Sequence, residues 1–291
     1  MSRQNYSQKH SSCDYYNKPI YYPIVRDNFY LLDNQNNIIS FRAPENGQEI
    51  ICENNYVVNN RPIIGLLDGQ QAVGIDFRPA INKLYLLART QQIARLYILD
   101  IDDPCKIIAT PVGSNLVTDT GIIIQLNGSS FGVDFNPVVD RLRVVSDTGQ
   151  NLRINPTNGV TIIDGDLSFA TNDVNSGTVP RVGGAAYTNS FAGTTTTTLY
   201  DIDTNQNILV TQNPPNEGIL NTVGSLGINI SEYLGFDIVG RTNTAFAVLR
   251  VSGNTGLYNI NLSTGRATLL KHFIQCGQSN SQIIGLAILP I

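Results

Sequence analysis

Aspartate recurs at one position of a short motif, which is the clearest arrangement of chemically active side chains in the sequence. The motif is glycine, an apolar residue, aspartate and a second apolar residue, and this alternation is typical of a β-strand. It occurs at Gly74–Phe77, Gly132–Phe135 and Gly235–Ile238, and with alanine in place of aspartate at Gly184–Tyr187 and Gly285–Ile288.

The aspartates of the motif have two interpretations. If the motif strands surround a common axis, three carboxylates converge there and could hold a hard cation such as calcium, which prefers oxygen ligands. Alternatively, each carboxylate accepts backbone N–H groups or pairs with a basic residue such as Arg78 or Arg141. We favour the second interpretation, because a buried charge needs such a partner. The candidates for binding at this axis are Asp76, Arg78, Asp134, Asn136 and Asp237.

A second candidate cation site follows a predicted strand later in the chain. Asp201, Asp203 and Asn205 have the D-x-D-x-N spacing that opens a calcium-binding loop. The sixth position is Gln206 instead of glycine, and the twelfth is Gln212 instead of glutamate. A tight turn between two strands explains the same residues, and we favour the turn. The same interpretation applies to Asp100, Asp102 and Asp103.

Polar side chains on predicted loops form a third candidate site, suited to a small polar ligand or a glycan. They are Asp147, Gln150, Asn151 and Arg153, with Asn213, Asn216 and Glu217. These stretches are also ordinary turn sequences. The chain has no tryptophan, the best platform for stacking a sugar, although its 13 tyrosines could replace it.

Groups for catalysis are few. The two histidines, His10 and His272, are not expected to form a Ser-His-Asp group. A pair of carboxylates could support glycoside hydrolysis, but no spacing selects such a pair. The sequence contains no phosphate-binding loop of the Walker type. A non-catalytic role is therefore expected.

The motif repeats along the chain. Its glycines, at positions 74, 132, 184, 235 and 285, lie 50 to 58 residues apart. A period of this size, made of short strands, is the signature of a β-propeller or a related repeat. No segment keeps a 3.6-residue apolar period beyond two turns, so we expect very little helix.

The two ends of the chain complement each other. Residues 28–53 contain three expected strands, FYLLD, IISFRA and EIIC, but no motif strand, whereas Gly285–Pro290 is a motif strand with no strands after it. Sharing one blade would close the ring and remove exposed sheet edges. The predicted fold is therefore an all-β, five-bladed β-propeller over residues 28–291, closed by pairing the C-terminal strand with the N-terminal blade strands.

Composition excludes several classes of protein. Among 291 residues only 14% are charged, and the net charge is −4, which argues against nucleic acid as a partner. No apolar run approaches 18 residues, so no membrane span is expected, and the N-terminus lacks the apolar region of a secretory signal. The cysteines form no CxxC pair, so a zinc site is not expected. Their even number permits disulfides, but a chain of this size does not need them, and the lack of an export signal favours free thiols. The cysteines are Cys13, Cys52, Cys105 and Cys276.

Residues 1–27 lie outside the repeat and are interpreted as an N-terminal arm. They are rich in serine, asparagine, glutamine and tyrosine, with tyrosine pairs at Tyr15-Tyr16 and Tyr21-Tyr22. Such a segment is either a disordered terminus or a docking element. We expect it to mediate self-association or binding to another structural protein.

Long stretches of the chain resemble one protein family. They are GIDFRP (74–79), FGVDFNPVVDRLRVVSDTGQNLRINP (131–156), AAYTNSFAGTTTTTLYDID (185–203) and LVTQNPPNEGILNTVGSLG (209–227). On these stretches, residues 74–289 resemble the bacterial DUF4394 family, a domain of unknown function. The resemblance implies a propeller-like β-repeat, often found in secreted or surface proteins, and it implies no catalytic residues.

The expected function is a non-catalytic binding or structural module that takes part in assembling a surface layer, particle or appendage. Low charge, abundant asparagine, threonine and glutamine, and the N-terminal arm favour this function. The alternative is a hydrolase that acts on a glycan or lactone through the carboxylates at the axis, with or without calcium.

Overall fold

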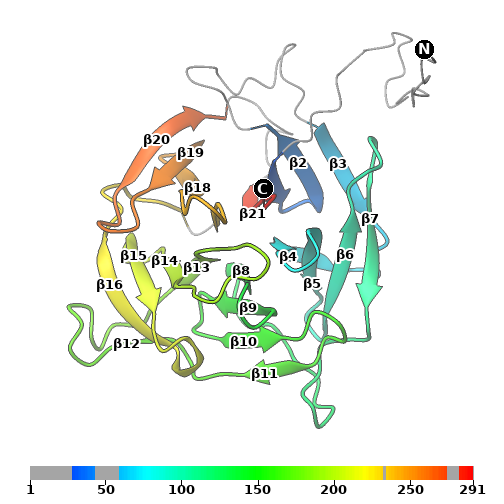
Figure 1. Cartoon of the computed structure of the whole chain (residues 1–291), viewed down its shortest axis with the longest axis horizontal. Coiled ribbons are helices and arrows are strands. Elements are labelled where there is room, and N and C mark those ends of the chain that lie inside the picture. Colours follow the sequence, from blue (N-terminus) through cyan, green and yellow to red (C-terminus); the bar gives the residue numbers. More distant parts are fainter. Residues whose placement is uncertain (1–27, 43–58, 232–233, 274–281, 291) are drawn as a thin grey trace.

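The computed structural model describes residues 28–42, 59–231, 234–273 and 282–290, and these residues form a chain of β-strands (Figure 1). The one helix among them is a single 3-10 turn, η1 (Pro215–Glu217). The predictions of an all-β fold and very little helix are therefore confirmed. None of the helical structure described is long and apolar enough to cross a bilayer.

The largest sheet has eight strands in the order β21-β1-β2-β3-β7-β6-β5-β4. Neighbouring strands in it are antiparallel, except that β3 pairs in parallel with β7 and so joins two four-stranded halves. The first half contains β21 (Ile283–Ile288), β1 (Phe29–Asp33), β2 (Asn37–Phe41) and β3 (Asn59–Ile64). The second half contains β4 (Gln71–Arg78), β5 (Lys83–Arg89), β6 (Ala94–Asp100) and β7 (Ile107–Val112).

Three smaller sheets follow along the chain. The first contains β8 (Phe131–Asn136), β9 (Arg141–Ser146), β10 (Asn151–Ile154) and β11 (Thr161–Ile163). The second contains β12 (Ser168–Phe169), β13 (Val182–Tyr187), β14 (Leu199–Asp203), β15 (Ile208–Gln212) and β16 (Ile219–Ser225), with β12 parallel to β16. The third contains β17 (Leu234–Ile238), β18 (Ala245–Val251), β19 (Asn254–Ile260) and β20 (Ala267–His272).

The ends of the described chain meet in one sheet. β1 pairs with β21 in antiparallel register, with Phe29 opposite Ile288 and Leu31 opposite Leu286. The predicted pairing of the C-terminal strand with the N-terminal strands is thus present. The strand beside β2 is β3, which the sequence did not predict. The predicted strand EIIC lies outside the described residues.

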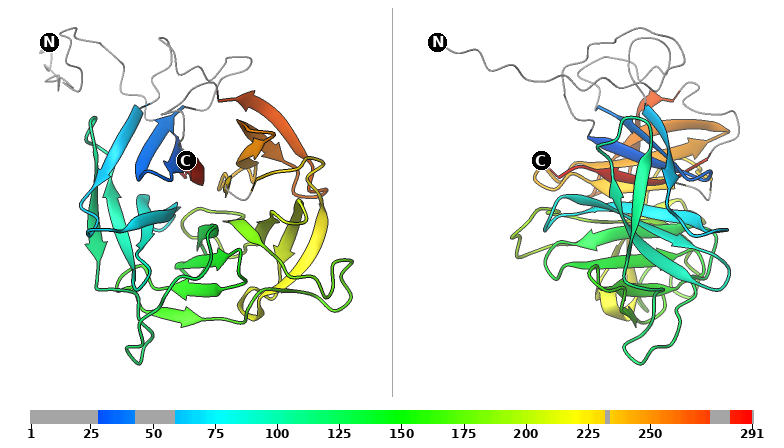
Figure 2. Two further views of the ribbon diagram at one scale, coloured as in Figure 1. Left: turned by 180° about the vertical axis from the view of Figure 1, so that it is seen from behind. Right: turned by 90° about the vertical axis from the view of Figure 1, so that its right-hand side faces the viewer.

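The first strands of the repeats lie around a common centre, as Figure 1 shows for β4, β8, β13 and β21, and Figure 2 shows the same arrangement from behind. A Cβ atom added to Gly74 in β4 would lie 2.3 Å from a Val133 methyl in β8. One added to Gly132 in β8 would lie 2.6 Å from the backbone nitrogen of Ala185 in β13. The motif requires glycine because these inner strands approach too closely for a side chain.

Apolar side chains fill the space between neighbouring sheets. One buried cluster joins residues of the β4–β7 strands to residues of the β8–β11 sheet, and Tyr85 meets Phe135 edge-on with ring centroids 5.2 Å apart. Each fully buried side chain of this size contributes roughly 1.5–3 kcal/mol. The packing between sheets therefore holds the inner strands, and the side chains they carry, in fixed positions.

Cys105 is disulfide-bonded, so the prediction of free thiols is wrong for this residue. The other three cysteines lie outside the described residues. The lack of an export signal favoured free thiols, but a disulfide forms wherever the fold brings two cysteines within bonding distance.

Candidate functional site

Three aspartates from different sheets meet at the centre. Asp76 in β4, Asp134 in β8 and Asp237 in β17 are each at most 3% exposed, and one carboxylate oxygen from each lies within 4.8 Å of the others. Their strands bring them together because each aspartate follows the motif glycine by two residues and so lies on the same face of its strand.

Backbone amides surround this aspartate cluster. Asp76 accepts the N–H groups of Phe77 and Phe135, both at 2.7 Å. Asp237 accepts those of Ile238 and Ile288, both at 2.6 Å, and Asp134 accepts that of Tyr187 at 3.2 Å. The donors belong to β4, β8, β17, β21 and β13, so three carboxylates serve one amide from every inner strand.

The alanines of the motif fit the same scheme. Ala186 and Ala287 stand where the other repeats have aspartate, and the amides that follow them, of Tyr187 and Ile288, are accepted by Asp134 and Asp237. Each such carboxylate reaches across to the next inner strand. Three aspartates therefore accept one N–H group from each of the five inner strands.

The predicted ion pairs of the aspartates are not formed. Arg78 donates instead to Asp140, through Nε at 2.8 Å and through a second contact, and also to the Tyr85 hydroxyl. Arg141 donates to the carbonyl of Asp140 at 2.9 Å. Asn136 accepts the N–H groups of Val138 and Val139 and so caps a turn.

Burial without a basic partner raises the pKa of all three carboxyls. For Asp76 the cause is loss of hydration and then the charge of Asp237, and for Asp134 it is loss of hydration and then the charges of Asp76 and Asp237. Burial raises the pKa of Asp237 to about 7, although its two amide hydrogen bonds lower it. Each carboxyl of this cluster therefore keeps its proton to a higher pH than an exposed aspartate does.

Space at the centre is small. The void between the motif glycines, lined by residues such as Gly74, Gly132 and Gly235, has a volume of about 10 Å³. That is about the space one water molecule needs. A glycan unit or a lactone is larger than this void.

The predicted calcium loop forms the hydrogen bonds of a turn. Asp203 accepts the N–H groups of Asn205 and Gln206, at 2.9 and 2.8 Å, and that of Arg181 at 2.9 Å. Asp201 is fully buried, and neither of its oxygens has a hydrogen-bond partner among the described residues. Burial raises the pKa of Asp201 to about 8, with the charge of Arg143 acting in the opposite direction.

The predicted polar cluster is divided between two places. Asn151, Arg153 and Asn216 gather around Arg143, which is 1% exposed. Arg143 donates to Asn151 at 2.7 Å, to Asn216 at 2.8 Å and to Asp164 at 2.6 Å, and Asp164 also pairs with Arg153. These contacts join the β8–β11 sheet to η1. Asn213 and Glu217 flank or lie in η1.

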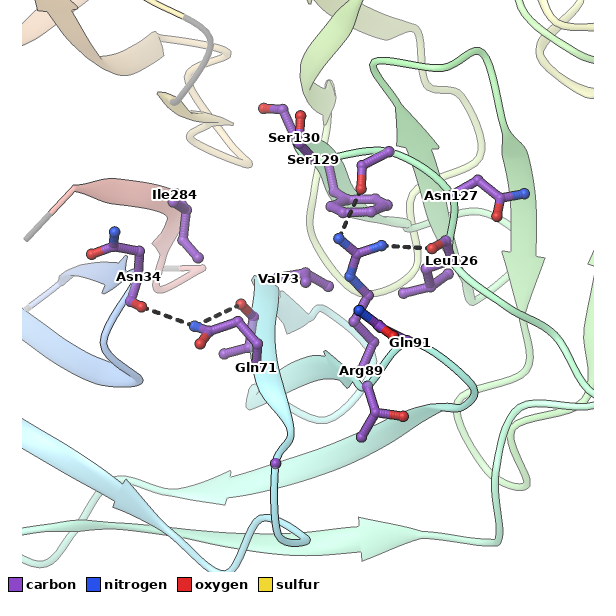
Figure 3. Close-up of a pocket in the computed structure, with 15 residues that line it drawn as sticks. Asn34, Gln71, Val73, Arg89, Gln91, Leu126, Asn127, Ser129, Ser130 and Ile284 are labelled. Carbon is purple, nitrogen blue, oxygen red and sulfur yellow. Dashed lines mark hydrogen bonds between the residues drawn. The ribbon is translucent and has the colours of Figure 1, made fainter.

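A larger pocket opens beside the inner strands, at the edge where β4, β5 and β8 meet (Figure 3). We call it the rim pocket. Its volume is about 720 Å³. Its lining residues are Asn34, Gly69, Gln71, Ala72, Val73, Arg89, Thr90, Gln91, Leu126, Asn127, Gly128, Ser129, Ser130, Phe131 and Ile284.

Two residues of the predicted polar cluster do not line the rim pocket but form hydrogen bonds with the loop that does. Asp147 accepts the N–H and the hydroxyl of Ser129, at 2.8 and 2.6 Å. Gln150 accepts the N–H of Asn127 at 2.9 Å and donates to the carbonyl of Gln125 at 2.9 Å. The loop that forms one wall of the pocket is thus fixed by the turn that contains Asp147.

Sequence reasoning missed the residues that line the rim pocket. They come from the β1–β2 turn, β4 and the turn before it, β5 and the turn after it, the loop before β8, the start of β8, and β21, and nothing in their local spacing marks them. It also missed Arg143. The one signal for Arg143 was a basic residue at an inward position of an otherwise apolar strand, Leu142–Val145.

Comparisons with known proteins agree with this architecture. Residues 52–287 match the model of a family described as a domain of unknown function, DUF4394, and the match begins 22 residues before the stretch identified from the motifs. A comparison with curated protein sequences finds no match.

Solved structures show the fold. The chain is similar to the crystal structure of a nidogen/laminin complex, at 11% identity and a TM-score of 0.50 over 90% of this chain and 98% of that one. It is also similar, at a TM-score of 0.43 and 10% identity, to a putative 6-phosphogluconolactonase from Bacteroides uniformis, over 85% of this chain and 83% of that one. The first likeness supports a propeller-like fold and carries no information on activity.

Proposed function

The chain belongs to the DUF4394 family, a domain of unknown function, and we propose that it is a non-catalytic module that binds a small polar ligand, such as a glycan unit, in the rim pocket. The observation that carries this proposal is the pocket itself. A volume of about 720 Å³ lies within the usual range for small-molecule sites, about 300–1,000 Å³. Its lining combines amide and hydroxyl groups with apolar side chains, which suits a ligand that has hydroxyl groups and an apolar face.

The alternative of a hydrolase has less support. Its carboxylates would have to contact a substrate, but Asp76, Asp134 and Asp237 are buried and accept backbone N–H groups. Five of their six oxygens are occupied in this way. The same occupation weakens the prediction of a calcium site, because calcium takes six to eight oxygen ligands.

The framework we propose for this module is a five-bladed propeller. Four-stranded units begin at β4, β8, β13 and β17, and β21 with β1, β2 and β3 would make the fifth. The inner strands contact one another in the order β4, β8, β13, β17, β21. A Cβ atom added to Gly285 in β21 would lie 3.4 Å from the Ile75 side chain in β4. This return to β4 supports the count of five.

The proposed role in assembly rests on residues 1–27, which lie outside the described residues. We propose, as the sequence predicts, that this arm joins copies of the chain or docks on another structural protein of a surface layer, particle or appendage. Ligand binding in the rim pocket and assembly through the arm are separate properties, and each has its own test.

Ligand binding is tested by filling the pocket. Asn127 lines it and is exposed, whereas Gln125 is exposed on the same loop but is not part of the lining. The three proteins are tested for binding on a glycan array and against a small-metabolite library. We expect a ligand that binds both the wild type and the control Gln125→Trp not to bind Asn127→Trp. If the wild type binds a ligand that Asn127→Trp retains, the rim pocket is not the site.

A further inference from the structure

Arg89 is the one charged side chain among the described residues that line the rim pocket. Its guanidinium lies over the Phe131 ring, 4.8 Å from the centroid. It donates to the carbonyls of Leu126 at 2.6 Å and Gly128 at 2.7 Å (Figure 3). The side chain is therefore fixed in one orientation at the wall of the pocket.

Among the described residues, no carboxylate contacts Arg89 directly to neutralise its charge. Both of its hydrogen-bond acceptors are neutral carbonyls, and these use two of the five N–H groups that an arginine carries. Asp147 acts on Arg89 through its charge, but its carboxylate accepts two hydrogen bonds from Ser129. Burial lowers the pKa of Arg89, and the charge of Asp147 acts in the opposite direction.

We propose that the ligand of the rim pocket carries a carboxylate, which Arg89 binds while the neighbouring amides and hydroxyls bind its polar groups. Arginine matches a carboxylate in geometry as well as charge. Gln71, Asn127 and Ser129 surround the same space and suit the hydroxyl groups of an acidic sugar. This inference rests on the proposed function and narrows it from a polar ligand to an acidic one.

Removing Arg89 would be ambiguous, because the same side chain supports the loop at Leu126–Gly128. We therefore add an opposing charge instead. Gln91 lines the pocket, is exposed, and its side chain makes no hydrogen bond among the described residues. Gln92 is exposed beside it but is not part of the lining. Gln91→Glu and Gln92→Glu change the net charge equally and form a matched pair.

The probes are methyl glucuronide, the uncharged methyl glucoside, and acetate, measured by ligand-observed NMR and calorimetry. We expect the glucuronide to bind at least fivefold more tightly than the glucoside. Gln91→Glu should weaken glucuronide binding about fivefold at low salt, and Gln92→Glu should leave it nearly unchanged. Acetate binding comparable to that of the glucuronide would support the carboxylate and show that the sugar adds little.

Two outcomes would overturn the inference. If the glucoside binds as tightly as the glucuronide and Gln91→Glu has no effect, the pocket takes neutral ligands, and the proposed function stands without the acid. If neither the glucuronide nor acetate binds, the carboxylate is rejected, while the array experiment with Asn127→Trp still decides whether the pocket binds anything.

Discussion

Replacing Asp237 tests the chemistry of the buried aspartate cluster. The pKa of Asp237 is about 7 in the folded protein, against an ordinary value of 3.8. The folded state therefore binds a proton more tightly than the unfolded state, and stability falls as the pH rises from one value to the other. Each pH unit between these two pKa values lowers the free energy of unfolding by about 1.4 kcal/mol. Ionisation of Asp237 alone therefore lowers it by on the order of 4 kcal/mol between pH 4 and pH 8.

The variant Asp237→Asn should be less stable than the wild type at low pH and more stable at high pH. Asparagine has one oxygen, so one of the amides of Ile238 and Ile288 loses its acceptor, at a cost of about 1–3 kcal/mol. Below pH 5 the variant should therefore be less stable than the wild type. At pH 8 the order should reverse, because the variant has no charge to bury at this position.

The assay is urea unfolding across pH 4–8 in the presence of a chelator, with Asp119→Asn as a control in which an exposed carboxylate is removed. In Asp237→Asn, the free energy of unfolding should depend less steeply on pH than in the wild type. Some dependence should remain, because burial also raises the pKa of Asp76 and Asp134. A wild-type stability that is constant or rises over this range would refute the reasoning. Calcium added at pH 8 should raise stability only if the predicted calcium site exists.

Three further predictions concern buried residues of the described structure, and a fourth concerns the N-terminal arm. Asp201→Asn should make the protein more stable at pH 8 and above in thermal melts, because the buried carboxyl, whose pKa is about 8, no longer ionises. Gly74→Ala should cost about 1–3 kcal/mol in urea unfolding, and Gly285→Ala less, because a Cβ would lie 2.3 Å from its neighbour in the first case and 3.3 Å in the second. Arg143→Met should cost about 3–5 kcal/mol by leaving Asp164 buried without one of its partners. Deleting residues 1–27 should convert an assembled chain to a monomer by light scattering, and an unchanged mass would contradict the role of the arm.

The repeat was accessible from the sequence because a strand has a period of two. In Gly-Ile-Asp-Phe and its copies, the glycine and the aspartate lie on the same face, and the structure brings that face of each inner strand against the next strand. The unpaired motif strand at Gly285 likewise predicted its pairing with β1.

Other features depend on which loops meet in space. The rim pocket combines residues from Asn34 to Ile284, which are 250 positions apart, and no local pattern could connect them. The strand β3 was missed because its sequence, NNRPII, begins with turn-forming residues, and its place is set by pairing with both β2 and β7.

The all-β class, the repeated motif, the pairing of the two ends and the recurrence of aspartate at one motif position could be predicted from the residues alone. The contacts of those aspartates depend on the fold, because the N–H group that Asp76 accepts belongs to Phe135, 59 residues along the chain. The same holds for the location of the pocket. Periodicity along a chain records which face of a strand is buried, whereas hydrogen-bond partners and cavities are set by how separate sheets pack together.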